Sequence, residues 1–267
     1  MKYIIDALKY LKSNLLLLPA LAVAILAFAP VIDYSAAQHI LDTLDAGKVT
    51  SQFVAWFKLF TPFNSENWLT IVLSIVSYIA LVLDVAYIHS MVDKHIRFGS
   101  KSFRSIMSSF TINFIYGLIA MVILFAAVLI LALLMALIMS AFALAAPYVF
   151  IVGIILCLAL IVLFMFIAAH FFLWLPCAEI TGFKMSEALY SSYAQARTVR
   201  WRNFVAIGLP LAFALMLTAL FGLALGSAAG TFAGSIFYGC AYMIIVVASY
   251  MAYADVEGIE REDLKKY

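Results

Sequence analysis

The sequence predicts an all-α integral membrane protein with six transmembrane helices. The chain of 267 residues is 67% hydrophobic and only 11% charged, whereas a soluble domain is typically about 45–50% apolar and about 25% charged. Its mean hydropathy is +1.12. Six stretches also approach or exceed the roughly 20 apolar residues that a helix needs to cross a bilayer. A water-soluble core has no room for so much apolar surface, so lipid is the expected solvent.

The six predicted spans form one membrane domain, 1–267, and lie near 14–32, 68–90, 113–139, 148–175, 204–226 and 231–253. Between Arg104 and Glu179 there is no Asp, Glu, Lys or Arg, and this run is divided near 140–147 into two spans. Residues 203–254 also lack these types, with a turn near GSAAG, 226–230. Because a backbone in lipid must satisfy its own hydrogen bonds, these spans are predicted to be helices. The first span is expected to stay uncleaved.

The basic residues predict that both termini lie in the cytoplasm, because cytoplasmic segments of membrane proteins are rich in Lys and Arg. Of the 16 Lys and Arg, only Lys48 and Lys58 fall outside the terminal segments and the second and fourth connections. The inner connections carry Lys101, Arg104, Lys184, Arg197, Arg200 and Arg202. We expect these groups to meet anionic lipid head groups. Docking of a cytoplasmic protein is the alternative.

The 33–66 segment is predicted to be an extracellular loop. Its polar and aromatic stretch QHILDTLDAGKVTSQFVAWFKLF is typical of one or two short helices that lie along a membrane surface.

The cytoplasmic connections share a pattern. HIRFGSKSFRSIMSSF (95–110) and AEITGFKMSEALYSSY (178–193) align through Gly99 and Gly182, and Gly258 follows the sixth span similarly. Each glycine is expected to end its helix in the left-handed conformation. Where each hairpin begins, an asparagine stands at the membrane boundary: Asn14, Asn113 and Asn203. We therefore predict three internal repeats, each an interfacial helix followed by a two-span hairpin. The alternative is that interfacial segments simply favour Gly, Lys, Ser and aromatic residues.

Asp84 and His170 are the ionisable residues that lie clearly inside predicted spans. Such residues are the first place to look for function in a membrane protein. Both fall toward the cytoplasmic ends of their spans, so we predict that they meet at a similar depth. A charged pair would relay protons or coordinate a cation. The alternative is a structural hydrogen bond that joins the second span to the fourth.

Gly222, Gly226, Gly230 and Gly234 recur every four residues across the last hairpin. Small residues at that spacing let helix backbones approach closely. Because the turn falls inside the series, it does not form one continuous ridge. We predict tight packing of the fifth and sixth spans, with a subunit contact as the alternative.

The sequence predicts no metal, no cofactor and no nucleic-acid partner. DVAYIHSMVDKH places His89 and Asp93 four residues apart on one helix face, but it lacks a recognised ligand spacing. Phosphate loops, nucleophile elbows, HExxH and dinucleotide fingerprints are missing. We therefore predict that the protein is not an enzyme. An intramembrane enzyme that uses Asp84 and His170 is a remote alternative.

The segments DALKYLKSNLLLLP and GFKMSEALYSSYAQARTVRWRNF resemble motifs of poorly characterised six-span bacterial membrane proteins. These families are related to the membrane domain that is fused to glycerophosphoryl diester phosphodiesterases. The resemblance covers nearly the whole chain and implies a six-span fold in a prokaryotic plasma (inner) membrane. It implies no phosphodiesterase activity, because the catalytic domain is missing here.

These observations predict a non-enzymatic membrane component, an accessory or scaffold protein in envelope or lipid-related processes. The alternative is a permease subunit that works with a cytoplasmic energy-coupling partner, docked on the basic connections. A transporter would hold a polar cavity between its helices, whereas a scaffold would be a closed, dry bundle.

Overall fold

The computed structural model describes residues 1–32, 52–61, 68–100, 103–143 and 147–262. Every regular element in these ranges is a helix, which confirms the predicted all-α class. The long helices are α5 (Trp68–Phe98), α6 (Phe103–Ala143), α7 (Pro147–Phe171), α9 (Met185–Leu225) and α10 (Ser227–Val256). The shorter ones are α1 (Lys2–Ser13), α2 (Leu18–Phe28), α4 (Gln52–Phe60) and α8 (Trp174–Thr181), with a 3-10 turn at Leu15–Leu17.

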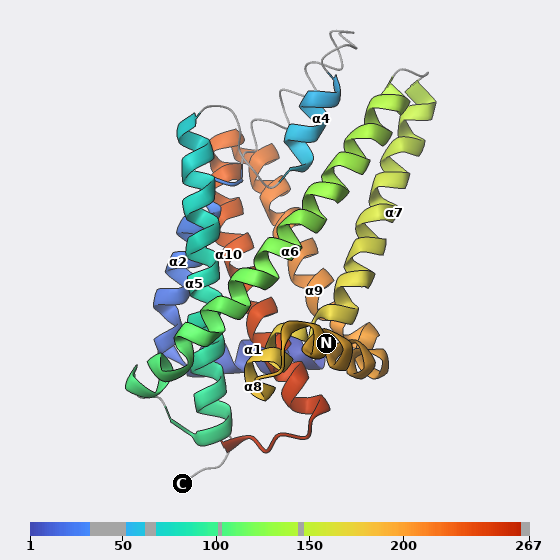
Figure 1. Cartoon of the computed structure of the whole chain (residues 1–267). Coiled ribbons are helices and arrows are strands. Elements are labelled where there is room, and N and C mark those ends of the chain that lie inside the picture. Colours follow the sequence, from blue (N-terminus) through green and yellow to red (C-terminus); the bar gives the residue numbers. More distant parts are fainter. Residues whose placement is uncertain (33–51, 62–67, 101–102, 144–146, 263–267) are drawn as a thin grey trace.

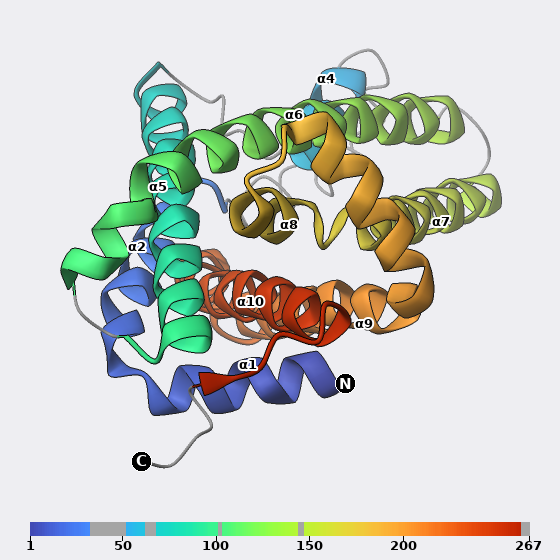
Figure 2. The same cartoon turned by 60° about the horizontal axis from the view of Figure 1, so that its bottom comes forward.

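Figure 1 shows α5, α7 and α10 running between the two ends of the molecule, with α6 tilted across them. At the lower end of that view, α1 and the first part of α9 lie across the ends of the long helices (Figures 1 and 2). There α8 follows α7, and Ile151–Thr181 counts as one candidate span. The N-terminus and the end of α10 lie at this end of the bundle, whereas α4 is at the opposite end, beside α6.

Five helices are long and apolar enough to cross a membrane by themselves. The first predicted span, 14–32, differs from them, because α1 and the Leu15–Phe28 segment meet at a bend of 95°. The α2 helix has 11 residues, or about 16 Å of length against a hydrocarbon core of about 30 Å. Pro19 stands in the first turn of α2, where a missing N–H is tolerated. A sixth span is reached only when this bent pair is counted as one.

The α1 helix is amphipathic and packs along one face. Tyr3, Ala7 and Tyr10 are buried, and this spacing places them on the same side of a helix. Its other side exposes Leu8 and Lys9. An exposed face of this mixed kind is typical of a helix that lies in the plane of a membrane surface.

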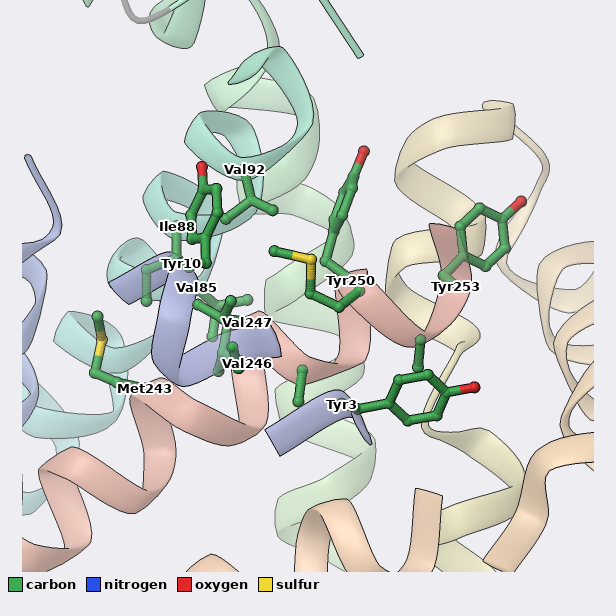
Figure 3. Close-up of a cluster of buried hydrophobic side chains, with 14 of the residues drawn as sticks. Tyr3, Tyr10, Val85, Ile88, Val92, Met243, Val246, Val247, Tyr250 and Tyr253 are labelled. Atoms are coloured by element: carbon green, nitrogen blue, oxygen red, sulfur yellow. The ribbon is translucent and has the colours of Figure 1, made fainter. Parts of the chain in front are cut away.

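The main core joins α1, α5 and α10 near the lower end of the bundle. Figure 3 shows its side chains, and those that it labels are Tyr3, Tyr10, Val85, Ile88, Val92, Met243, Val246, Val247, Tyr250 and Tyr253. Residues of α8 and α9 extend this cluster. The chain ends and the lower half of α5 are therefore held in one packed unit.

Small residues let the helices of this unit approach one another closely. On α10, a Cβ added at Gly234 would lie 3.0 Å from Thr218 Cγ2 of α9, which confirms the predicted tight packing of the last two spans. The buried positions of α9 are small over most of its length: Ala188, Ser192, Ala196, Asn203, Ala206, Pro210, Ala214, Thr218 and Gly222. Gly222 is thus the last member of a row of small buried residues along α9.

The α4 helix lies within the predicted 33–66 loop and packs against the far halves of α6 and α7. Trp56 of α4 is buried in a second cluster with Met135, Met139 and Cys157. Residues 33–51 and 62–66 of the loop lie outside the described part of the chain. Elsewhere α7 exposes apolar side chains around most of its circumference: Ile151, Val152, Ile154, Ile155, Leu156, Leu158, Val162, Leu163 and Ile167.

The glycines predicted to end helices adopt the expected conformation. Gly99, Gly182 and Gly258 have φ of 63°, 69° and 63°, and the Gly182 N–H donates to the Ala178 carbonyl at 3.0 Å. The three ends are alike in this respect. The three-repeat hypothesis as a whole stays a prediction.

Gly182→Ala is expected to lower the free energy of unfolding by about 1–2 kcal/mol, because a Cβ disfavours the left-handed conformation. An added Cβ at Gly182 meets nothing within 4 Å, so the cost comes from the backbone alone. Gly182→Asn is expected to cost less, because Asn visits this region more readily. Thermal unfolding in detergent compares the variants, and equal losses for Ala and Asn would contradict this account.

Candidate functional site

Four polar residues in the lower half of α5 are buried: His89, Ser90, Asp93 and His95. They fall within seven residues, so they point around the helix rather than along one face. Each has a partner on another helix, as described below. We call these four residues and their partners the α5 polar cluster.

His89 lies between a carboxylate and a hydroxyl. Its Nδ1 is 2.6 Å from Oε2 of Glu179 on α8, and its Nε2 is 3.4 Å from Oγ of Ser249 on α10. The side chains of His89 and Glu179 are 2% and 3% exposed. The Tyr250 ring meets the His89 ring edge-on, with centroids 6.0 Å apart. One imidazole therefore ties α5 to both α8 and α10.

Asp93 carries several compensating contacts. Its Oδ1 accepts hydrogen bonds from the Tyr250 hydroxyl at 2.5 Å and from Arg97 Nη1 at 3.1 Å. Lys94 Nζ lies 3.7 Å from Oδ2. Buried carboxylates are stable when paired and hydrogen-bonded in this way. Asp93 thus connects α10 to the basic end of α5.

Two further contacts tie α5 to α1 and α6. His95 Nδ1 and the Tyr10 hydroxyl are 3.0 Å apart. Asn113 Nδ2 of α6 donates to Ser90 Oγ at 2.9 Å, with both residues buried. The α5 helix is therefore joined by polar contacts to α1, α6, α8 and α10.

The Ser90–Asn113 contact is expected to show a coupling energy of about 0.6 kcal/mol, the average for side-chain hydrogen bonds between membrane helices. A double-mutant cycle of Ser90→Ala and Asn113→Ala measures it through unfolding in detergent. The sum of the losses of the two single variants should exceed the loss of the double variant by that amount. Full additivity would show that this hydrogen bond stabilises nothing.

The other two boundary asparagines are also buried but use different partners. Asn203 Nδ2 donates to the Ala169 carbonyl of α7 at 3.1 Å. Asn14 Nδ2 donates to the Tyr10 carbonyl at 2.9 Å, within its own end of α1. The three asparagines therefore share burial at a boundary, whereas only Asn113 and Asn203 join neighbouring helices.

The contacts of Asp84 and His170 do not support their predicted pairing. His170 Nδ1 lies 2.9 Å from the Phe166 carbonyl of its own helix, and its ring stacks on Tyr193 of α9. Asp84 is buried on α5, and its Oδ2 has no hydrogen-bond partner. Nearby, the Tyr242 hydroxyl of α10 donates to the Leu81 carbonyl at 2.8 Å. Asp84 thus lies near Tyr242 of α10, and its pairing with His170 stays a prediction.

The predicted cytoplasmic basic residues are exposed where the structure describes them. Arg104, Lys184, Arg197, Arg200 and Arg202 are all exposed, and Lys101 lies outside the described ranges. On the first part of α9, Tyr190 and Trp201 are exposed beside these cations. This end of the molecule is thus both basic and aromatic.

Glu179, His95, Ser249 and Tyr250 belong to the cluster but are not among the residues that the sequence predicts. Glu179 and Asp255 each stand three residues before a helix-ending glycine, Gly182 or Gly258. The two residues differ in the structure, because Asp255 forms an exposed ion pair with Lys2 while the Glu179 side chain is buried against His89. The sequence contains a signal for Glu179, because it directly follows 74 positions without Asp, Glu, Lys or Arg.

Among the residues that the structure describes, no group of three or more His, Cys, Asp or Glu is placed to hold a metal ion. His89, Asp93 and His95 turn to separate partners instead. The arrangement is suited to hydrogen bonding and to the exchange of a proton between His89 and Glu179.

No family model, no curated protein and no solved structure matches this chain. The resemblance to the membrane domains fused to glycerophosphoryl diester phosphodiesterases stays a prediction.

Proposed function

We propose that the chain is a non-enzymatic component of a prokaryotic plasma membrane, an accessory or scaffold protein in envelope or lipid-related processes. The observation that carries this proposal is that the α5 polar cluster joins helices to one another. Its buried polar side chains join α5 to four other helices. Buried polar groups used in this way hold a helix bundle in one arrangement.

The exposed surfaces agree with such a role. An apolar helix surface like that of α7 is stable in lipid, and the basic, aromatic end is suited to anionic head groups. With that end in the cytoplasm, both termini are cytoplasmic as well. Protease accessibility of the termini in inside-out and right-side-out vesicles tests this orientation.

Purification in a mild detergent, followed by identification of retained proteins and lipids, tests the scaffold proposal. A scaffold is expected to retain a defined protein partner or a defined anionic lipid. Substrate uptake by proteoliposomes that contain the chain alone would contradict the proposal.

A second candidate is the permease subunit, and the exposed basic first part of α9 favours it. Such a surface would dock a cytoplasmic energy-coupling protein through charge complementarity. Arg197→Glu with Arg200→Glu is expected to release that partner during purification. The matched change Lys9→Glu with Lys12→Glu on α1 should leave it bound. Retention of the partner by both variants would count against docking on α9.

A further inference from the structure

We propose that His89, Glu179 and Ser249 form a buried proton-binding site, and that its proton keeps α8 docked on α5 and α10. This inference goes beyond the scaffold role. It rests on three contacts and on one unpartnered oxygen.

The Ser249 contact determines where one imidazole hydrogen lies. The Ser249 hydroxyl donates its single hydrogen to the Val246 carbonyl, at 2.8 Å. Toward His89 it therefore acts as an acceptor, so His89 Nε2 carries a hydrogen. The order serine, histidine, carboxylate is that of a catalytic triad, but here the serine proton is directed to a backbone carbonyl rather than to the base. The geometry favours a proton site over an activated nucleophile.

The Glu179 contact requires a second proton. His89 Nδ1 and Glu179 Oε2 are 2.6 Å apart, and two atoms that both act only as acceptors would repel at this distance. One hydrogen therefore lies between them. The pair is then neutral as a whole, either as imidazolium with carboxylate or as imidazole with carboxylic acid. Burial favours this neutral state over a lone charge.

As long as Nε2 keeps its hydrogen toward Ser249, removing that proton would leave the contact between Nδ1 and Oε2 without an attractive term. The result is a buried carboxylate that faces the lone pair of Nδ1. Glu179 Oε1 is buried and has no hydrogen-bond partner, so no other donor stabilises the added charge. The carboxylate would gain by moving toward water, and α8 would move with it.

The groups that face the site do not replace the lost proton. Asp93 of α5 and Tyr250 of α10 act on Glu179 electrostatically, and Asp93 is itself engaged with Tyr250, Arg97 and Lys94. Also on α8, Cys177 lies near Tyr253, Ser191 and Thr181, and the Thr181 hydroxyl donates to the Cys177 carbonyl at 2.6 Å. The remaining charged group near Cys177 and Tyr253 is Glu257.

The α8 helix is bounded at each end by a short break in helical structure. It has eight residues and ends at Gly182, whose φ is 69°. At its other end, a break at Phe172 and Leu173 separates it from α7. Cys177 in the middle of α8 is completely buried, so its thiol reports whether α8 is docked.

The test measures maleimide labelling of Cys177 in the full chain in nanodiscs, with Cys157→Ala and Cys240→Ala in the background. The rate is compared with that of Glu179→Gln from pH 6.5 to pH 9. The Gln amide donates to Nδ1 without a proton to lose. Because thiolate formation affects both proteins alike, the ratio of rates isolates the site. We expect the labelling rate of the protein with Glu179, divided by that of Glu179→Gln, to rise roughly tenfold from pH 6.5 to pH 9, because one linked proton is released.

Glu187→Gln, an exposed change of the same kind on α9, is the matched control and should track the unsubstituted protein. A ratio to Glu179→Gln that stays constant with pH overturns the coupling. Nitrogen-15 NMR of labelled histidines tests the site independently of any variant at Glu179. His89 Nε2 should stay protonated while Nδ1 loses its proton as the pH rises. A deprotonated Nε2, or an Nδ1 unchanged over this range, overturns the proton assignment.

Discussion

His89→Ala is expected to lower the free energy of unfolding by about 3–5 kcal/mol, the usual cost of removing one partner from a buried charged pair. The change leaves the Glu179 carboxyl group, whose side chain is 3% exposed, without its hydrogen bond to His89. It also removes the link from α5 to Ser249 of α10. Chemical denaturation in mixed micelles, followed by circular dichroism, measures the loss.

His170→Ala is the matched control for this prediction. The residue is only partly buried, and its hydrogen bond stays within α7. The expected loss is below about 1 kcal/mol, as for substitutions away from buried networks. Similar losses at the two histidines would show that the His89–Glu179 pair has no special weight in stability.

Gly239→Ala is expected to lower the free energy of unfolding by about 1–3 kcal/mol through overpacking. An added Cβ would lie 2.8 Å from Ile25 Cγ1 and 3.1 Å from both Ile25 Cα and Ile25 N. The backbone of α2 would have to shift, and α2 is the short helix that follows the bend. Thermal unfolding of the purified protein measures the effect.

Gly117→Ala provides the control for packing, because the same change there meets only ordinary contacts. The nearest atoms belong to Val82 and lie 3.8 Å away. Since alanine is favoured over glycine inside a helix by about 0.5–1 kcal/mol, this variant should be neutral or slightly stabilised. Destabilisation of both variants to the same degree would sink the close-contact explanation for Gly239.

The long helices could be predicted because their cause is local. Runs without charge, such as 203–254, have no stable place outside lipid or a core. Divided at its turn near 226–230, this run forms two segments that are each long enough to cross a bilayer. Gly182 likewise carries its own explanation, since only glycine readily takes the left-handed conformation at a helix end. The bend at the first span has a local cause too, because α1 ends at Asn14 and Pro19 stands in the first turn of α2.

The polar contacts could not be predicted, because they depend on how helices rotate and cross. Asp84 and His170 are predicted to lie at similar depths, and His170 is hydrogen-bonded to its own helix and stacks on Tyr193. Depth is a property of sequence position, whereas direction is set by packing around the helix axis. The partner of His89 lies 90 residues away in the chain, and no pattern within a span indicates it.

Composition and charge order alone determined that this is a helical membrane protein and which segments its long helices contain. These properties follow from the transfer of backbone and side chains into lipid, which acts on each segment separately. Only the tertiary structure decided that His89 meets Glu179 and Ser249, that α1 turns across the end of the bundle, and that Gly239 meets Ile25. Such contacts arise when several helices pack at once, because a side chain's partner is then chosen by its neighbours in space.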